Sequence, residues 1–242
     1  ELKLSSGEFA EQSAFIGKSG PLKDYEIYFD DDVGSFRNFR DRDYNFLEKL
    51  TQKKQIFIED LAEALGFPDF HWKGPSWSCF YHAVFNKRPT SVITARVHPP
   101  KTIRRGIRLM VKEGHLPQEP NYLSIYPVSH LKVRNQLLPG ETSIAKLKQA
   151  AIRASVERAF QRYGYNEHHR FGMSDDDPKN IQLIVEEMAR LKTTYKENSF
   201  FVIETHKGRF IKHEVFADHT EDKIVAEEDQ MNLFCASPRS KS

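Results

Sequence analysis

Two groups of three aspartates follow apolar runs of the 242-residue chain. Residues 30–32 come directly after the run 27–29, and residues 175–177 come shortly after the run 171–173. Like charges at this density repel one another, so a counter-charge is expected beside them. Carboxylate oxygens suit Mg²⁺, which commonly binds one or two carboxylates together with waters and a substrate phosphate.

Other side chains complete a set that could transfer a phosphoryl group. One carboxylate can attack phosphorus and form an aspartyl-phosphate, and another can protonate the leaving oxygen and later deprotonate water. Thr94 ends another apolar run, and Lys146 and Lys148 lie near the start of a helical pattern. Their hydroxyl and ammonium groups can hold phosphoryl oxygens as charge develops. Each feature alone has an ordinary structural explanation, but the combination favours metal-assisted phosphoryl transfer.

The elements that must position these residues alternate along the chain. Apolar runs predict strands, and helical patterns cover 101–112, 142–163 and the segment from Pro178, where Asp177 suits an N-cap. This alternation predicts an α/β fold with an open, mostly parallel sheet. Ligands bind beyond the carboxyl ends of such strands, which is where Thr94 and the aspartates lie. The predicted strands are 27–29, 91–93, 122–128, 171–173 and 200–204.

The sequence predicts one core domain with additions. A polar N-terminal extension covers 1–22, the core covers 23–35 and 87–216, and an acidic, flexible tail covers 217–242. The segment 36–86 interrupts the alternation and is expected to be a cap with helices at 44–50 and 58–65. Its aromatic stretch favours a core of its own over a platform for substrate. Cys79, within that stretch, is expected to be a buried apolar residue.

At this point the motifs resemble those of the haloacid dehalogenase (HAD) superfamily, which has a Rossmannoid sheet sandwiched by helices. The first motif, an apolar strand followed by D-x-D, resembles Ile27-Tyr28-Phe29-Asp30-Asp31-Asp32. The second is a strand ending in Thr or Ser, and resembles Val92-Ile93-Thr94. The third is a lysine near the start of the helix before the fourth strand. The fourth resembles Asp175-Asp176-Asp177-Pro178-Lys179-Asn180.

The resemblance implies a role for each matching residue. Asp30 would be the nucleophile, Asp32 the general acid/base and a Mg²⁺ ligand through its carbonyl, and Thr94 a ligand of the phosphoryl group. Lys148 is preferred over Lys146 as the third-motif lysine, because Ile152 and Val156 continue its helix. The metal site would include Asp30, Asp32 and the acidic ligand Asp176, supported by Asp175 or Asn180. The implied activity is Mg²⁺-dependent hydrolysis of a phosphomonoester.

The substrate class stays open between a small phosphorylated metabolite, a phosphoprotein and a nucleic-acid end. With 36 basic and 34 acidic residues, the net charge of +2 argues for neither nucleic acid nor a membrane. However, residues 87–112 contain eight basic residues and no acidic one, which favours a large anionic or phosphopeptide partner. Arg96 could clamp a second anionic group. The alternative functions are a catalytically silent binding module and a polynucleotide-end phosphatase.

Two further features bear on the compartment. Cys79 and Cys235 are far apart and fit no metal spacing or disulfide framework, which indicates a reducing compartment or export without disulfides. No apolar run approaches the ~18 residues that a membrane span needs. The expected protein is therefore a cytoplasmic enzyme, or an exported one without disulfides, that has no transmembrane segment.

Overall fold

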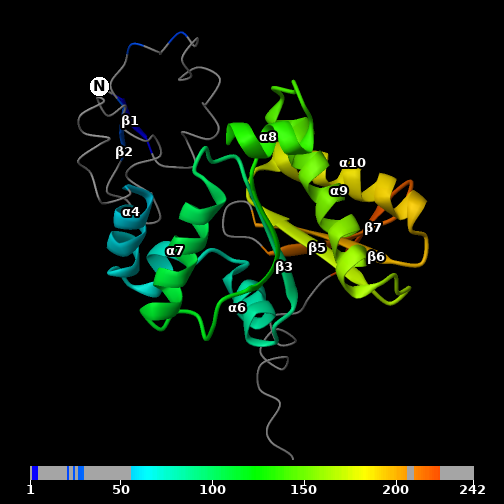
Figure 1. Ribbon diagram of the computed structural model, residues 1–242, viewed down its shortest axis with the longest axis horizontal. Coiled ribbons are helices and arrows are strands. Elements are labelled where there is room, and N and C mark those ends of the chain that lie inside the picture. The colour runs from blue at the N-terminus through cyan, green and yellow to red at the C-terminus, as the bar shows by residue number, and fades with distance from the viewer. Residues whose placement is uncertain are drawn as a thin grey trace, which may run out of the picture. The chain divides into compact units, whose positions relative to one another are not determined.

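The computed structural model describes residues 2–4, 21, 24, 27–29, 56–205 and 210–223. The chain forms two compact units, Glu1–Ile144 and Ala145–Ser242. Helices and strands alternate along both units, which confirms the α/β class (Figure 1). In the first unit, β1 (Leu2–Leu4) and β2 (Ile27–Phe29) form a parallel pair.

A β-α-β arrangement lies at the centre of the first unit. Strands β3 (Pro89–Thr94) and β4 (Asn121–Pro127) pair in parallel and are joined by α7 (Pro100–Lys112). Proline at the first turn suits the start of α7, because that position has no intrahelical hydrogen bond to lose. Gly114, with φ of +81°, follows the helix in a left-handed conformation that favours glycine. The short helix α8 (Leu131–Leu137) follows β4.

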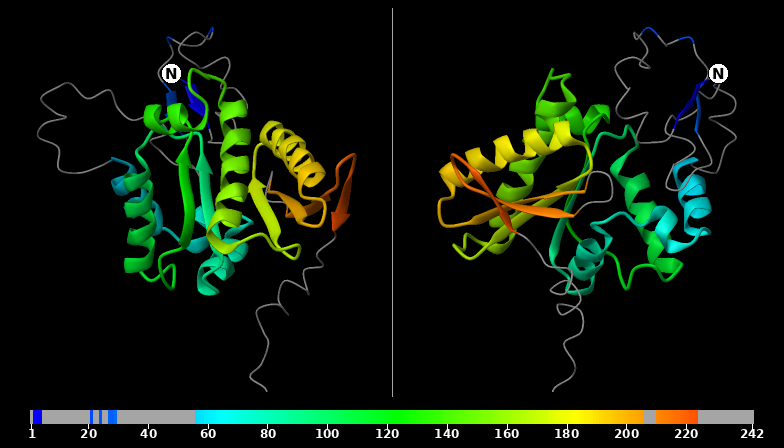
Figure 2. Two further views of the ribbon diagram at one scale, coloured as in Figure 1. Left: turned by 45° about the vertical axis from the view of Figure 1, so that its right-hand side comes forward. Right: turned by 180° about the vertical axis from the view of Figure 1, so that it is seen from behind.

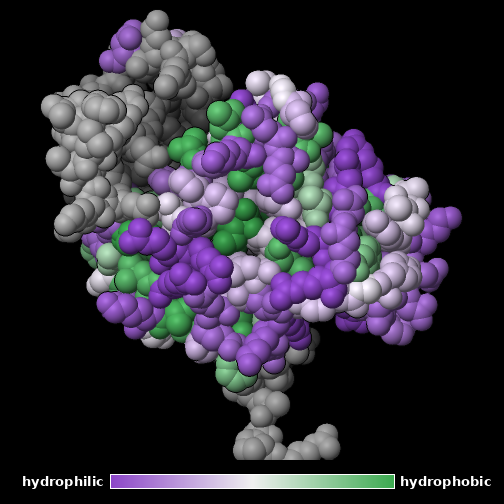
Figure 3. Space-filling view, viewed as in Figure 1, coloured by the Kyte–Doolittle hydropathy of each residue, from purple (hydrophilic) through white to green (hydrophobic). Residues whose placement is uncertain are grey.

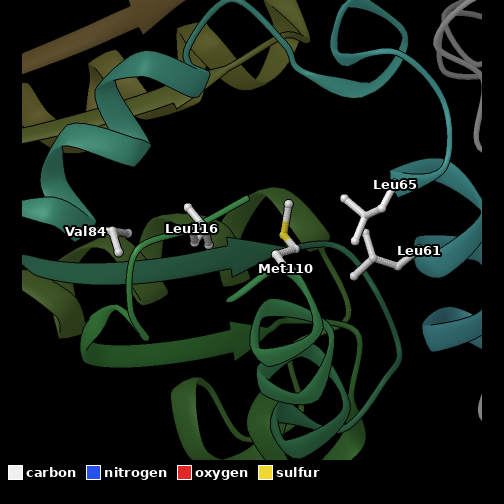
Figure 4. Packing of buried hydrophobic residues seen from close by; sticks show 5 residues of the cluster. All are labelled: Leu61, Leu65, Val84, Met110 and Leu116. Atoms are coloured by element: carbon white, nitrogen blue, oxygen red, sulfur yellow. The ribbon is translucent and has the colours of Figure 1, made fainter. Parts of the chain in front are cut away.

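The helices before β3 share a hydrophobic core with α7. Side chains from α4 (Ile56–Leu65) and α6 (Trp77–Phe85) cluster with Met110 of α7 and with Leu116. Figure 4 shows this cluster as a row that runs from Val84 through Leu116 and Met110 to the two leucines of α4. The described part of the predicted cap is therefore packed onto an element of the predicted core domain. Its role as a cap stays a prediction.

The aromatic stretch contributes to this core. The rings of Trp72, at the end of α5 (Asp69–Trp72), and of Trp77 and Phe80 pack against the cluster while they remain partly exposed. This packing supports a structural role over a substrate platform. Cys79 is exposed, so the expectation that it is buried is wrong. Cys79 follows Trp77 by two residues, about half a helical turn, so the two side chains point to opposite sides of α6.

Helix α7 separates apolar from basic side chains. Ile103, Gly106 and Met110 are buried, because they recur every three or four residues and face the core. In the region of α7, Figure 3 shows hydrophilic side chains interspersed with smaller hydrophobic patches. Much of the basic segment found in the sequence is thus the solvated face of this helix. The exposed basic residues of α7 are Lys101, Arg104, Arg105, Arg108 and Lys112.

The second unit packs two helices with a four-stranded sheet. Strands β5 (Arg170–Asp175) and β6 (Ser199–Glu204) are parallel, and β7 (Ile211–Val215) and β8 (Thr220–Lys223) continue the sheet antiparallel (Figure 2). The helices are α9 (Ile144–Tyr163) and α10 (Pro178–Thr194). The fully or almost fully buried apolar side chains of this unit include Leu147, Ala151, Ile184, Met188, Phe200, Val202 and Val215.

The sheets differ from the sequence prediction in two respects. The described strands pair as three separate sheets, so the single mostly parallel sheet stays a prediction. The hairpin of β7 and β8 was not predicted, and β8 occupies residues that were assigned to the flexible tail. Strand β8 pairs along its whole length with β7, which supplies hydrogen bonds that no local sequence signal could reveal. The rest of the predicted tail, 224–242, lies outside the described residues.

Candidate functional site

A buried ion pair joins α9 to the carboxyl end of β5. Lys148 Nζ donates to Asp175 Oδ2 across 3.2 Å, and the two side chains are only 9% and 12% exposed. Lys148 lies on the face of α9 that carries Leu147, Ala151 and Ile152 into the core, so its ammonium cannot reach bulk water freely. A lysine buried in this way requires a counter-charge, and Asp175 supplies it.

The second oxygen of Asp175 is held by the start of α10. Asp175 Oδ1 accepts from the backbone N–H of Asp177 and from the Asn180 side-chain amide, each at 3.0 Å. Asp177 caps the helix by accepting from the Lys179 N–H at 2.9 Å, which fixes this loop as predicted. Three donors therefore fix the Asp175 carboxylate, and one of its roughly four lone-pair positions is left open.

The residue that follows β6 forms hydrogen bonds with the backbone of Asp175. The Thr205 N–H and hydroxyl both donate to the Asp175 carbonyl, each at 3.1 Å. Asp175 and Glu204 are register partners in the parallel pair β5–β6. Neither Glu204 nor Thr205 was among the predicted site residues. The available signal was that Glu204 ends a predicted strand and Thr205 directly follows it.

In the first unit, Thr94 ends β3 with its hydroxyl at the carboxyl end of the strand. The hydroxyl accepts weakly from the Arg96 N–H at 3.4 Å, while the Thr94 carbonyl accepts from the Val128 N–H at 2.8 Å. The hydroxyl proton of Thr94 can still be donated to an anionic oxygen. The Arg96 guanidinium lies over the Phe57 ring, with 5.1 Å from its carbon to the ring centroid. This cation–π contact holds Arg96 beside α4.

The structure thus brings together part of the residue set found in the sequence. Lys148, Asp175 and Asn180 form one hydrogen-bonded group. Lys146 is exposed, so Lys148 is the lysine that matches the motif in its contacts. Asp176 is exposed as well, and Asp175 is the aspartate that contacts Lys148 and Asn180. The role of Asp176 as a metal ligand stays a prediction. Successive side chains along β5 point to opposite faces of the sheet, and Asp175 is therefore the aspartate that faces Lys148.

Asp30 and Asp32 lie outside the described residues, so their predicted roles remain predictions. Within the described segments, no group of three or more His, Cys, Asp or Glu side chains is placed to hold a metal ion. The predicted metal ligands nevertheless bind through oxygen atoms, which Mg²⁺ prefers. Asp175 keeps one open lone-pair position, which suits a single bond to Mg²⁺. Across the described helices, none is long and apolar enough to cross a membrane.

A second charged group spans β6, β7 and β8. His213 Nδ1 lies 2.7 Å from Asp222 Oδ1, and its Nε2 lies 3.6 Å from Glu204 Oε2. His213 is the cross-strand partner of Asp222, so pairing of the hairpin creates this contact. These contacts link the carboxyl end of β6 to the β7–β8 hairpin.

Shifted pKa values occur away from these residues. Burial, followed by the charge of Glu119, raises the pKa of Tyr122 to about 12. Burial opposes the shift of Glu119, but hydrogen bonds from Arg108 and Arg104 lower its pKa overall. The mutual hydrogen bond of Asp218 and His219 lowers the pKa of the carboxyl group and raises the pKa of the imidazole. These shifts report surface ion pairs and one half-buried phenol.

The chain was compared with known proteins. No family model, curated protein or solved structure matches it.

Proposed function

We propose that the protein is a Mg²⁺-dependent phosphomonoester hydrolase of the HAD type that uses Asp30 as its nucleophile. The observation that carries this proposal is the group formed by Lys148, Asp175 and Asn180. A buried lysine on one helix and a strand-end aspartate followed by a capped helix match the third and fourth motifs of the resemblance. The resemblance requires Lys148 and Asp175 to lie close together. Because 27 residues separate them in the sequence, their spacing alone does not predict this contact.

In the proposed reaction, the Asp30 carboxylate attacks phosphorus and forms an aspartyl-phosphate as the bond to the leaving oxygen breaks. Asp32 donates a proton to that oxygen. Asp32 then takes a proton from water, which attacks the aspartyl-phosphate and releases inorganic phosphate with Asp30 restored. The hydroxyl of Thr94 and the ammonium of Lys148 would bind phosphoryl oxygens, which carry more negative charge in the transition state.

Mg²⁺ would be held by Asp175 with Asp176, together with Asp30 and Asp32. When bound, the ion neutralises negative charge on the phosphoryl group and on the carboxylates around it. Lys148 and Asn180 keep the Asp175 carboxylate in one orientation, so that its open lone pair faces a fixed direction. This assignment makes Asp175 the principal acidic ligand of the fourth motif.

The test is hydrolysis of p-nitrophenyl phosphate by the full chain with Mg²⁺, with EDTA, and by Asp30→Asn. Asp31→Asn is the matched control, because it removes a neighbouring carboxylate to which the proposal gives no role. We expect EDTA to abolish turnover and Asp30→Asn to reduce kcat by about 10³-fold or more, with Asp31→Asn close to wild type. Turnover that survives in Asp30→Asn would exclude this nucleophile. Mg²⁺ binding without hydrolysis of any phosphorylated compound in a panel would favour the binding module instead.

A further inference from the structure

Just beyond the carboxyl end of β4 lie two buried polar atoms that have no hydrogen-bond partner among the described residues. They are His130 Nδ1 and Arg134 Nε. An arginine Nε–H is always a donor, and its burial without an acceptor costs free energy unless a ligand or water supplies one. Arg134 and His130 also share one turn, because the Arg134 N–H donates to the His130 carbonyl at 2.9 Å. Their side chains therefore begin close together in space.

This turn continues directly from the strand that pairs with Thr94. Pro127 is the register partner of Thr94 in the parallel pair β3–β4. The next residue, Val128, donates its N–H to the Thr94 carbonyl, and the His130 N–H donates to the Pro127 carbonyl at 2.9 Å. Figure 2 shows α8 beyond the arrowheads of β3 and β4. His130 and Arg134 thus occupy the same edge of this strand pair as the Thr94 hydroxyl.

The two segments that leave β3 and β4 carry basic residues and no acidic one. The two segments that leave the strands, 94–100 and 128–137, contain no aspartate or glutamate. The two acidic residues between them, Glu113 and Glu119, precede β4 and therefore lie toward its amino end. A basic edge of this kind attracts an oxyanion, and a guanidinium binds one through paired N–H donors. The basic residues of the two segments are Arg96, His98, His130, Lys132 and Arg134.

Three other described residues that have such an atom, His169, Asn198 and Trp72, occur in different settings. His169 and Asn198 stand directly before β5 and β6, at the amino ends of those strands. Trp72 belongs to the aromatic packing around the hydrophobic cluster. His130 and Arg134 differ from them because two such groups share a turn, and because that turn lies at a strand end where ligands bind in α/β proteins.

We propose that His130 and Arg134 bind a second anionic group of the substrate, beside the phosphoryl group that Thr94 binds. The inference rests on the proposed function, since that function gives Thr94 its ligand. The substrate class that follows is a phosphomonoester with a further carboxylate or phosphate. Arg96, which the sequence suggested for this role, is held over Phe57, whereas Arg134 Nε is buried without an acceptor.

The test measures binding without turnover, by calorimetry on the full chain with Mg²⁺. The probes are phenylphosphonate, which carries one anionic group, and 4-phosphonobenzoate and 1,4-phenylenediphosphonate, which carry a second one. We expect wild type to bind at least one of the doubly anionic probes about tenfold or more tightly than phenylphosphonate. Preference for the carboxylate or for the second phosphonate identifies the anion that the site takes.

Arg134→Gln should remove this preference and leave the affinity for phenylphosphonate unchanged. His130→Gln should reduce the preference independently, so the test stands even if one variant fails to fold. Lys132→Gln is the matched control, because Lys132 is an exposed cation on the same helix. Equal affinity of wild type for all three probes would overturn the inference, as would equal losses in Arg134→Gln and Lys132→Gln. Hydrolysis of p-nitrophenyl phosphate is scored separately, so failure of the anion site and failure of the proposed function are distinguishable.

Discussion

Lys148 and Asp175 form a buried ion pair between α9 and the end of β5, with 3.2 Å between Nζ and Oδ2. The carboxylate is also held by Asn180 and by the N–H of Asp177, so one residue links a helix, a strand and a helix N-terminus. A buried pair of this kind adds little net stability, because desolvation of both charges offsets their attraction. The ion pair instead fixes the orientation of the Asp175 carboxylate.

Removal of one member of this pair should be costly. Lys148→Met leaves the Asp175 carboxylate buried without its cation, and we expect a loss of about 3–5 kcal/mol in the free energy of unfolding. Lys146→Met, two residues earlier on an exposed position, should change it by less than about 0.5 kcal/mol. Urea denaturation measures both. A loss in Lys148→Met no larger than that in Lys146→Met would show that the pair does not form in solution.

Gly106 allows α7 to approach α4 closely. A Cβ at this position would lie 2.7 Å from Phe57 Cε1 and 3.0 Å from Leu61 Cδ2, so neighbouring atoms must move. We expect Gly106→Ala to destabilise the protein by about 1–2 kcal/mol, because overpacking outweighs the better helix propensity of alanine. In a Phe57→Leu background the same change should cost less, since the nearest ring atom is gone. Thermal unfolding of the four proteins provides the comparison, and an equal cost in both backgrounds would refute the contact.

A second charge pair joins α9 to α10 through a carboxylate that is buried and a guanidinium that is half exposed. Glu187 is fully buried; its Oε1 accepts from Arg153 Nε and lies near Arg153 Nη2, each at 2.8 Å, while Arg190 lies 3.2 Å from Oε2. Arg153→Leu should destabilise the protein by about 2–4 kcal/mol, because the buried carboxylate loses its closest donors. The double variant Arg153→Leu/Glu187→Leu should recover much of that loss. A double-mutant cycle by urea denaturation gives the coupling, and additive effects would mean that the pair is not coupled.

Tyr122 provides a prediction for high pH. Burial and the charge of Glu119 raise its pKa from 10.0 to about 12, so the folded state favours the neutral phenol. The unfolded phenol ionises near pH 10. The contribution of Tyr122 to stability is therefore complete below about pH 10 and is lost as the pH rises to about 12. Absorbance titration near 295 nm should show a late-ionising tyrosine component that is missing in Tyr122→Phe.

A titration in concentrated urea is the control for this experiment, because unfolding should return all tyrosines to values near 10. If the folded wild type and Tyr122→Phe titrate alike above about pH 11, burial does not hold the phenol neutral.

The sequence by itself determined the local elements of this protein. Proline at the start of α10, the N-cap at Asp177 and the helical period of apolar residues are local signals, and α4, α7, α9 and α10 form where these signals predict helices. The same holds for the apolar runs that became β3 to β6. Helices α5, α6 and α8 were not predicted, and the predicted helix 44–50 lies outside the described residues. The D-x-D motif and its chemistry are equally local features of the sequence, and they remain the basis for the proposed nucleophile.

Tertiary structure alone decided which side chains meet. Lys148 and Asp175 are distant in sequence, and only the packing of α9 beside β5 selects them over Lys146 and Asp176. The pairing of β8 with β7, the exposure of Cys79 and the buried atoms of His130 and Arg134 that have no partner among the described residues likewise depend on contacts between distant segments. The physical reason is that burial and hydrogen-bond partners are properties of the packed chain, whereas periodicity and caps act within a few residues.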